Sequence, residues 1–286
     1  MYDDFETLIV SSPGPCVLHV QINRPSKRNA MNAKFWTEFR ECFERIAEDS
    51  DARAVMVSGV GDHFSAGLDL ADNSNLTDIA KTSKDVARRA FRFRKLALAM
   101  QESFSAVERC PQPVVAAIHG ACVGAAVDLV CACDVRICSE DASFCIAEVK
   151  VGLAADVGTL QRMPKIVGNE SLCRELAFTG RFFGAAVALR MGFVSRTCGP
   201  GSRRKEAVEA SLVTAAEIAR QSPVAVFGTK RNIIYGRDHS VEDGLEYAAT
   251  WSGAALQAED LGKAMRAGIS RNKKGAGASH PTFSKL

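Results

Sequence analysis

Three carboxylates stand in or beside apolar sequence between residues 117 and 174: Asp128, Glu148 and Asp156. Burying a carboxylate is costly unless the group is hydrogen-bonded or protonated. Carboxyl groups that share a poorly solvated pocket can hold different protonation states, which suits them to giving and taking protons. The grouping therefore predicts a proton-transfer site, with these three side chains as the candidate catalytic residues.

Each carboxylate also has a structural explanation. Asp128 could be a partly buried helix residue bonded locally, and Glu148 could be a solvated charge at the end of a strand. Asp156 could be the N-cap of a helix that starts at residues 157–160. Taken separately, each explanation accounts for its residue at least as well as catalysis does. Asp134 and Asp141 are predicted to be structural turn residues.

Two small-residue turns could supply a complementary function. The turns are residues 65–68, Ser-Ala-Gly-Leu, and residues 124–126, Gly-Ala-Ala. The second opens a predicted helix, so its backbone N–H groups lack intrahelical partners. Two such N–H groups that face one point form an oxyanion hole. The alternative is that small residues here only permit close packing.

Strands and helices that would position these residues alternate along the chain. Strands are predicted at residues 16–22, 54–58, 113–118 and 135–138, and helices after Asn32 and over residues 85–109. Asn32 is a candidate helix N-cap. The stripe of Trp36, Phe39, Phe43 and Ile46 that follows has helical spacing and predicts a core face. The alternation favours an α/β fold built from crossover units.

The last third of the chain has no strand pattern. Residues 205–221, 224–235 and 241–268 are helical by pattern, and Pro200 and Gly201 mark a boundary. Three parts follow: a core domain at 1–200, a helical region at 201–271 and a flexible, polar tail at 272–286. Residues 241–268 hold more apolar positions than one helix face needs, so the helical region is predicted to carry assembly.

Composition excludes several classes of protein. The chain has 286 residues, 47% hydrophobic and 24% charged, with a net charge of +3 and both signs interspersed. Nucleic-acid binding needs a concentrated basic stripe, so no nucleic-acid partner is expected. No apolar run has membrane-spanning length, and the acidic start lacks a secretory signal. The 10 cysteines form no CxxC pair and lie mostly in apolar runs, so they are predicted to be reduced core residues.

Familiar cofactor motifs are absent as well. Gly59-Val60-Gly61 lacks the third glycine of a dinucleotide fingerprint, and there is no Walker A, HExxH or GxSxG sequence. The histidines are scattered; His63 is predicted to be a loop residue and His119 a packed one. We therefore expect no metal and no cofactor.

The final tripeptide, Ser284-Lys285-Leu286, matches the peroxisomal address that an import receptor reads. It follows a polar segment that would leave it accessible. The sequence therefore predicts import into a peroxisome or a related organelle such as a glycosome.

Several segments together resemble the crotonase, or enoyl-CoA hydratase/isomerase, superfamily. They are residues 23–30, 64–70, 118–136, 144–158 and 178–180, and the resemblance covers roughly residues 10–268. It implies a crotonase-like spiral of ββα units whose C-terminal helices form a homotrimer or a dimer of trimers. It also implies an acyl-CoA thioester substrate. By position, the backbone N–H groups of Leu68 and Ala125 would form the oxyanion hole.

The resemblance also assigns substrate-binding positions. Lys27 and Arg28 would bind the CoA phosphates, although ordinary surface charge explains them equally well. The remaining positions line the two turns: Ser65, Ala66, Gly67, Asp69 and Gly124. The second turn is Gly-Ala-Ala, whereas the superfamily usually has three glycines there. This change keeps the backbone N–H donor but narrows the space beside the acyl chain.

The carboxylates select a branch of the superfamily. Hydratases resemble one another in having Glu at the positions of Asp128 and Glu148 and Gly at that of Asp156. The trio here is similar to that of isomerases that convert 3,5-dienoyl-CoA to 2,4-dienoyl-CoA in the β-oxidation of unsaturated fatty acids. That reaction would assign Asp156 to the proton at C2, Glu148 to the proton at C6 and Asp128 to orienting Glu148. The alternatives are an enoyl-CoA hydratase and a non-catalytic acyl-CoA-binding protein.

Overall fold

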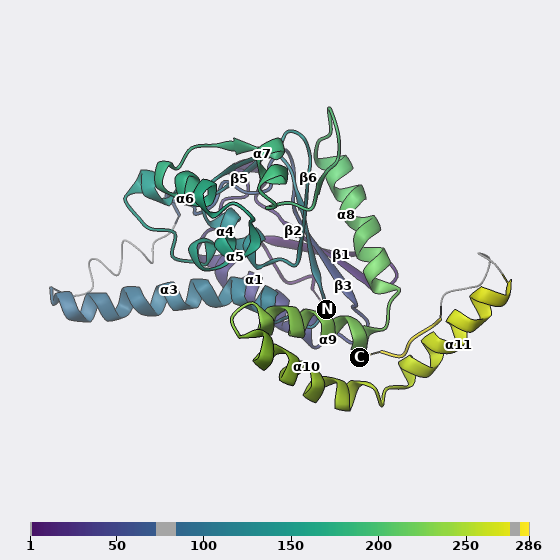
Figure 1. Cartoon of the computed structure of the whole chain (residues 1–286). Helices are drawn as coiled ribbons and strands as arrows, with labels where there is room; N and C mark the ends of the chain where they lie inside the picture. Colours follow the sequence, from purple (N-terminus) through teal and green to yellow (C-terminus); the bar gives the residue numbers. More distant parts are fainter. Residues whose placement is uncertain (1, 73–83, 275–280, 286) are drawn as a thin grey trace.

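The computed structural model describes residues 2–72, 84–274 and 281–285 (Figure 1). Its main sheet has six strands in the order β1-β2-β3-β4-β6-β9. Only the β1–β2 pair is antiparallel; the other neighbours are parallel. The strands are β1 (Leu8–Gly14), β2 (Val17–Ile22), β3 (Ala54–Gly59), β4 (Val114–Ile118), β6 (Val135–Cys138) and β9 (Arg196–Thr197).

A second sheet of three strands lies beside the main sheet, and the chain passes back and forth between the two sheets. Its order is β5 (Ala121–Val123), β7 (Ser143–Cys145) and β8 (Phe183–Gly184). From β4 to β7, consecutive strands alternate between the two sheets. Strand β4 lies in the main sheet and β5 in the second sheet, and helix α4 (Ala125–Ala132) follows them. Strand β6 then lies in the main sheet and β7 in the second. This confirms the predicted α/β spiral of ββα units.

Helices cover the main sheet, and its central strands are therefore buried. Every residue of β3 and β4 is buried, as expected for apolar parallel strands covered on both faces. Helix α1 (Ala33–Ala47) buries its aromatic stripe, which confirms the predicted core face. The Asn32 side chain accepts a hydrogen bond from the Phe35 N–H at 3.0 Å, so the predicted N-cap is confirmed.

The middle of the chain supplies the elements around the site. Helix α3 (Val86–Arg109) begins at the Asp85 N-cap and extends beyond the core (Figure 1). The short helix η1 (Pro25–Lys27) follows β2, and η2 (Glu148–Val151) follows β7. Helices α5 (Thr159–Ile166), α6 (Glu170–Thr179) and α7 (Ala185–Arg190) then lead to β9.

The C-terminal helices differ from the prediction in two ways. They are α8 (Arg204–Ala219), α9 (Pro223–Gly236), α10 (Val241–Ala255) and α11 (Glu259–Lys274). The single helix predicted over 241–268 is wrong, because α10 ends before residues 256–258 and the acidic pair Glu259 and Asp260 begins a new helix. The second difference concerns α8, which packs on β3, β4 and β6. The first helix of the region predicted at 201–271 therefore lies on the sheet of the predicted core domain.

The tail predicted to be flexible, residues 272–286, is ordered in the parts that the structure describes. Residues 272–274 complete α11, and the Phe283 side chain is buried, with 7% exposed. Arg53 Nη2 donates to the Phe283 carbonyl at 2.6 Å, and Lys263 Nζ bonds Ser284 Oγ at 3.2 Å. Lys285 forms an ion pair with Asp51. Residues 281–285 are therefore fixed to the subunit, and Leu286 lies outside the described residues. Within the described ranges, no helix has the length and apolar character to cross a bilayer.

Candidate active site

The two small-residue turns lie against each other. Ser65 N–H donates to the Ala121 carbonyl at 3.0 Å, and Val123 N–H donates to the Ser65 carbonyl at 3.1 Å. Gly67 has φ +84°, and a Cβ there would lie 2.3 Å from the Val123 oxygen and 3.3 Å from the Ala125 nitrogen. Only glycine permits this approach. The turns are thus brought into contact by strand pairing and by the absence of a side chain at residue 67.

Among the described residues, the Leu68 N–H on the first turn and the Ala125 N–H on the second have no backbone acceptor. Met31 N–H donates to the Gly67 carbonyl at 2.7 Å, and the Met31 carbonyl accepts from Asp69 N–H at 3.0 Å. Met31 and Leu68 form a parallel bridge whose two bonds are made by residues 67 and 69, so the Leu68 N–H points away from Met31. Ala125 is the first residue of α4, whose N–H has no intrahelical partner. The predicted donors therefore lie on adjacent turns.

One cavity of about 130 Å³ joins the donor turns to the carboxylates. Asp128, Glu148 and Asp156 all line it, so the structure brings together the three predicted catalytic residues. The rest of the lining is mainly apolar, which suits an acyl chain. It consists of Ala66, Leu68, Leu70, Met100, Val123, Gly124, Ala125, Ala147, Val151, Leu153 and Val157.

Asp128 is bonded across the fold rather than locally. Its side chain is 1% exposed, and its Oδ1 accepts a hydrogen bond from the Thr159 N–H at 2.5 Å. Its Oδ2 has no partner among the described residues. Burial, then the negative charge of Glu148, raises the pKa of the Asp128 carboxyl to about 7, against the opposing bond from Thr159. Asp128 therefore resists ionisation and holds the start of α5.

Glu148 lies close to the donor of the second turn. It begins η2, and its Oε1 is 3.2 Å from the position of a Cβ on Gly124, the residue before Ala125. Its buried Oε2 has no partner in the described part of the chain. Burial raises the pKa of the Glu148 carboxyl, and the charge of Asp156 adds to that effect, against backbone hydrogen bonds that lower the pKa. The structure thus rejects a merely solvated charge.

Asp156 is not a helix cap. The N-cap of α5 is Gly158, with φ +141°, and the first free N–H of that helix, on Thr159, is bonded to Asp128. The Asp156 carbonyl accepts from Gln101 Nε2 at 2.7 Å, which fixes the backbone to α3. Its side chain is exposed in the single subunit, so burial was predicted wrongly for this residue. Val151 and Leu153, which line the cavity near it, are exposed as well, so this side of the cavity faces solvent.

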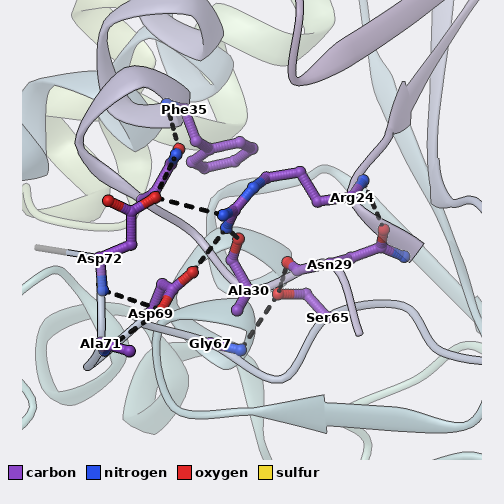
Figure 2. Close-up of polar contacts among 10 residues, drawn as sticks. Arg24, Asn29, Ala30, Phe35, Ser65, Gly67, Asp69, Ala71 and Asp72 are labelled. Carbon is purple, nitrogen blue, oxygen red and sulfur yellow. Dashed lines mark hydrogen bonds and ion pairs between the residues drawn. The ribbon is translucent and has the colours of Figure 1, made fainter. Parts of the chain in front are cut away.

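The predicted substrate-binding positions divide into two groups. Ala66 and Gly124 line the cavity, and Gly67 separates the turns. Ser65 and Asp69 do not line it: Ser65 Oγ donates to the Asn29 carbonyl at 2.7 Å, and Asp69 pairs with Arg24 at 2.8 Å (Figure 2). The Ser65 side chain therefore bonds a backbone carbonyl and the Asp69 side chain bonds Arg24, and these bonds stabilise the tight turn at residues 65–68.

The two predicted phosphate-binding cations are placed beside the first turn. Lys27 ends η1 and Arg28 follows it, and both side chains are exposed. The Arg28 carbonyl accepts from the Ala66 N–H at 2.9 Å. The backbone of Arg28 is therefore hydrogen-bonded to a residue of the cavity wall, Ala66.

Sequence reasoning missed several residues of the site. Met100, Leu153 and Val157 line the cavity, and Thr159 bonds Asp128. Each is an ordinary apolar or helix-start residue with no local signal. Arg24 lay in a motif segment, but nothing in the sequence paired it with Asp69, 45 residues later.

The remaining polar candidates are structural, as predicted. His119 is fully buried and its Nε2 lies 3.1 Å from the Gly61 carbonyl; His63 Nδ1 accepts from Ala121 N–H at 3.3 Å. Asp134 binds the Val114 N–H and Lys230, and Asp141 binds Ser139. All 10 cysteines are free thiols. No group of His, Cys, Asp and Glu side chains within the described ranges could hold a metal ion.

The raised pKa of Asp128 gives a stability prediction. An acid whose folded pKa lies above its unfolded value binds more protons when folded, so it destabilises the fold as pH rises between those values. For Asp128 that window runs from 3.8 to about 7. Between pH 5 and pH 8, ionisation of Asp128 is expected to lower the free energy of unfolding by an amount on the order of 2 kcal/mol, and Asp128→Asn should remove this pH-dependent decrease. Urea unfolding at both pH values measures it; identical pH dependence in the two proteins would contradict it.

Known proteins share both sequence and fold with the chain. The Enoyl-CoA hydratase/isomerase family matches residues 14–273. The human mitochondrial Delta(3,5)-Delta(2,4)-dienoyl-CoA isomerase is 50% identical over 283 residues, covering 99% of this chain and 84% of the relative. The Arabidopsis thaliana peroxisomal Delta(3,5)-Delta(2,4)-dienoyl-CoA isomerase is 41% identical over 271 residues, covering 94% and 93%.

A solved structure agrees with the topology. The crystal structure of an enoyl-CoA hydratase from Bacillus anthracis superposes with a TM-score of 0.82 and 25% identity, covering 98% of this chain and 99% of that one. Strands β2 to β9, and with them the ββα units and both donor turns, lie within the residues that the family matches. The chain therefore belongs to the enoyl-CoA hydratase/isomerase family.

Proposed function

We propose that this protein is an isomerase that converts 3,5-dienoyl-CoA to 2,4-dienoyl-CoA in the oxidation of unsaturated fatty acids. The observation that carries the proposal is one apolar cavity bordered by both donor turns and by Asp128, Glu148 and Asp156. Relatives with this activity in their names are 50% and 41% identical to the chain. The short-chain-enoyl-CoA hydratase of Clostridium acetobutylicum is 30% identical, and the Bacillus anthracis hydratase that shares the fold is 25% identical.

The thioester carbonyl would lie between the Leu68 and Ala125 N–H groups. Loss of a C2 proton makes that carbonyl an enolate, and donors placed for its negative charge lower the barrier. The charge spreads over the diene from C2 to C6. Protonation at C6 then moves the double bonds from positions 3 and 5 to positions 2 and 4. The reaction transfers one proton and no electrons, so it needs no cofactor.

We assign Glu148 to the C2 proton, which reverses the prediction made from the sequence. C2 is bonded to the thioester carbon, so its base must lie beside the oxyanion donors. The approach of Glu148 Oε1 to Gly124, next to the Ala125 donor, supports this assignment. Asp156, on the same cavity, would start protonated and donate that proton to C6. Transfer of the proton from Glu148 to Asp156 after turnover then restores both carboxyl groups. Asp128, whose pKa is raised in part by the charge of Glu148, would be the third carboxyl and would orient Glu148.

An ultraviolet assay separates the proposal from its alternatives. Isomerisation of a 3,5-dienoyl-CoA conjugates the diene with the thioester, so absorbance appears. Hydration of a 2-enoyl-CoA removes conjugation, so absorbance is lost. A non-catalytic acyl-CoA-binding protein gives neither change. Hydration without isomerisation would replace the proposed function with that of a hydratase.

Lys27 and Arg28 are proposed to bind the phosphates of CoA. No ion pair engages either side chain within the described residues, and both are exposed beside the first turn. We expect Lys27→Gln and Arg28→Gln to raise KM for dienoyl-CoA, with a difference from the unaltered protein that shrinks as salt is added. Arg174→Gln, on an exposed ion pair of α6, is the control. An unchanged KM in both variants would reject this role.

The organelle is proposed from the final tripeptide. The human relative is named mitochondrial and the Arabidopsis relative peroxisomal. Ser284 and Lys285 are exposed although they contact the subunit, so a receptor that binds them would displace the Lys285–Asp51 ion pair. Such a receptor, reading Ser284-Lys285-Leu286, would direct the protein to a peroxisome or glycosome. We expect deletion of Leu286 to leave the protein in the cytosol, as seen by microscopy of a fluorescent N-terminal fusion. Unchanged import after the deletion would contradict the assignment.

A homotrimer or a dimer of trimers is proposed as the assembly. Helix α10 has no buried residue, and Val241 and Leu245 on it are 81% and 67% exposed. Helices α10 and α11 lead away from the sheets (Figure 1). Apolar side chains left exposed in this way usually mark a contact surface. Sedimentation at micromolar concentration tests the assembly.

A further inference from the structure

A nearly buried ion pair lies directly behind the first donor turn. Arg24, between β2 and η1, has a side chain 15% exposed, and that of Asp69 is 8% exposed. Arg24 Nη1 donates to Asp69 Oδ2 at 2.8 Å (Figure 2). The proposed mechanism uses neither residue. Withdrawing a charge pair from water is costly, so the pair by itself adds little net stability, and its contacts indicate another role.

The contacts of Asp69 organise the chain that follows the turn. Its Oδ1 accepts hydrogen bonds from the N–H groups of Ala71, at 3.2 Å, and Asp72, at 3.1 Å. Burial alone would raise the pKa of the Asp69 carboxyl, but Arg24 and these N–H groups lower it. Asp69 is therefore held as an anion with both oxygens engaged, immediately after Leu68.

The contacts of Arg24 organise the facing segment. Its guanidinium also contacts the Ala30 carbonyl, and Nη2 lies 3.4 Å from Asp72 Oδ2. Its backbone N–H donates to Asn29 Oδ1 at 2.9 Å. The Asn29 carbonyl in turn accepts from Ser65 Oγ at 2.7 Å, and that oxygen accepts from the Gly67 N–H at 3.1 Å. Figure 2 shows these contacts joining the two segments.

Leu68 lies between these supports. The Gly67 carbonyl and the Asp69 N–H are both bonded to Met31, the residue after Ala30. The direction of the Leu68 N–H therefore depends on the spacing between residues 30–31 and 67–69. Arg24 bridges that spacing, because one guanidinium nitrogen contacts both the Ala30 carbonyl and Asp69.

We infer that the Arg24–Asp69 pair is a positioning device that aims the Leu68 N–H at the thioester oxygen. The inference rests on the proposed function, since it concerns the oxyanion hole of that reaction. Neither side chain lines the cavity, so neither touches substrate. A displacement of about 1 Å in such a group costs roughly a hundredfold in rate. The pair acts on the rate of turnover rather than on binding.

The test compares Asp69→Asn with a matched control. In Asp69→Asn an amide N–H group faces the guanidinium, so the contact with Arg24 is lost while Oδ1 can still accept from the backbone. Glu38→Gln makes the same charge change in a carboxylate that is 8% exposed, binds the N–H groups of Glu6 and Thr7 and lies near Lys34. Glu38 does not line the cavity.

We expect kcat of Asp69→Asn to fall roughly 10- to 100-fold with KM nearly unchanged, and that of Glu38→Gln to stay normal. Bound 2,4-dienoyl-CoA gives a second reading, because hydrogen bonds to its carbonyl shift its absorption to longer wavelength. That shift should shrink in Asp69→Asn only. Arg24→Lys keeps the positive charge but loses the planar set of guanidinium N–H donors, so it should lose part of the activity. The double variant Arg24→Met/Asp69→Asn should be little worse than either single variant.

Two results would overturn the inference. One is a folded Asp69→Asn protein with normal kcat and a full absorption shift. The other is a salt-dependent rise in KM alone in Arg24→Lys, which would make Arg24 a phosphate ligand. If Asp69→Asn does not fold, the same readings on Arg24→Lys decide. Absence of isomerisation by the unaltered protein would instead refute the proposed function.

Discussion

Asp156→Asn is expected to fold and to bind acyl-CoA normally while its kcat for dienoyl isomerisation falls roughly a hundred- to ten-thousand-fold. An amide cannot donate or accept the transferred proton, and losses of general acid–base groups have this size. Binding should persist because the donor turns at Leu68 and Ala125 do not depend on this side chain. The structure has already rejected a capping role, since Gly158 is the N-cap of α5.

The roles of the carboxylates can be separated in heavy water. If Glu148 removes the C2 proton, Asp156→Asn should still exchange C2 hydrogen for deuterium without forming product, and Glu148→Gln should do neither. The opposite pattern would restore the assignment predicted from the sequence. Asp128→Asn should lose less activity, and the double variant Glu148→Gln/Asp156→Asn should be little worse than either single variant.

The control is Asp238→Asn, an exposed carboxylate that pairs with Lys165 outside the cavity. It should turn over normally. Near-normal isomerisation by a folded Asp156→Asn protein would end the proposed mechanism. Circular dichroism and binding of a saturated acyl-CoA establish that each variant is folded before its rate is interpreted.

Gly67→Ala is expected to lower kcat by roughly a hundred- to a thousandfold, the loss typical of removing one oxyanion donor. The added Cβ would lie 2.3 Å from the Val123 oxygen, so the two donor turns must separate. They then can no longer both reach one oxygen. The positive φ of +84° adds backbone strain of about 1–3 kcal/mol.

A second glycine separates the clash from the strain. Gly192 has φ +82°, and a Cβ there would meet only the Gly168 nitrogen, at 3.8 Å, an ordinary contact. Gly192→Ala should lose stability through the strain alone, and therefore less than Gly67→Ala, and should keep its kcat. Thermal unfolding and turnover are measured on both variants. Equal kcat losses in the two would show that strain, and not the approach of the turns, causes the effect.

Local chemistry explains which elements were predictable. The aromatic stripe of α1, its Asn32 cap, the buried strands β3 and β4 and the Asp85-capped α3 all depend on residues close in sequence. Strand β1 was missed because most of its residues are exposed, so it lacks the apolar alternation of a half-buried strand. The break between α10 and α11 was missed because neither Gly nor Pro marks it.

By itself, the sequence determined the types of group at the site: two turns with free N–H groups and a trio of carboxylates in apolar surroundings. Only the tertiary structure decided what each group contacts. Strand pairing brought Ser65 to β5, α5 offered its first N–H to Asp128, and η2 placed Glu148 against Gly124. The physical reason is distance along the chain. Caps and periodic faces follow from neighbouring residues, whereas contacts between residues 24 and 69 or 128 and 159 exist only once the sheets have packed.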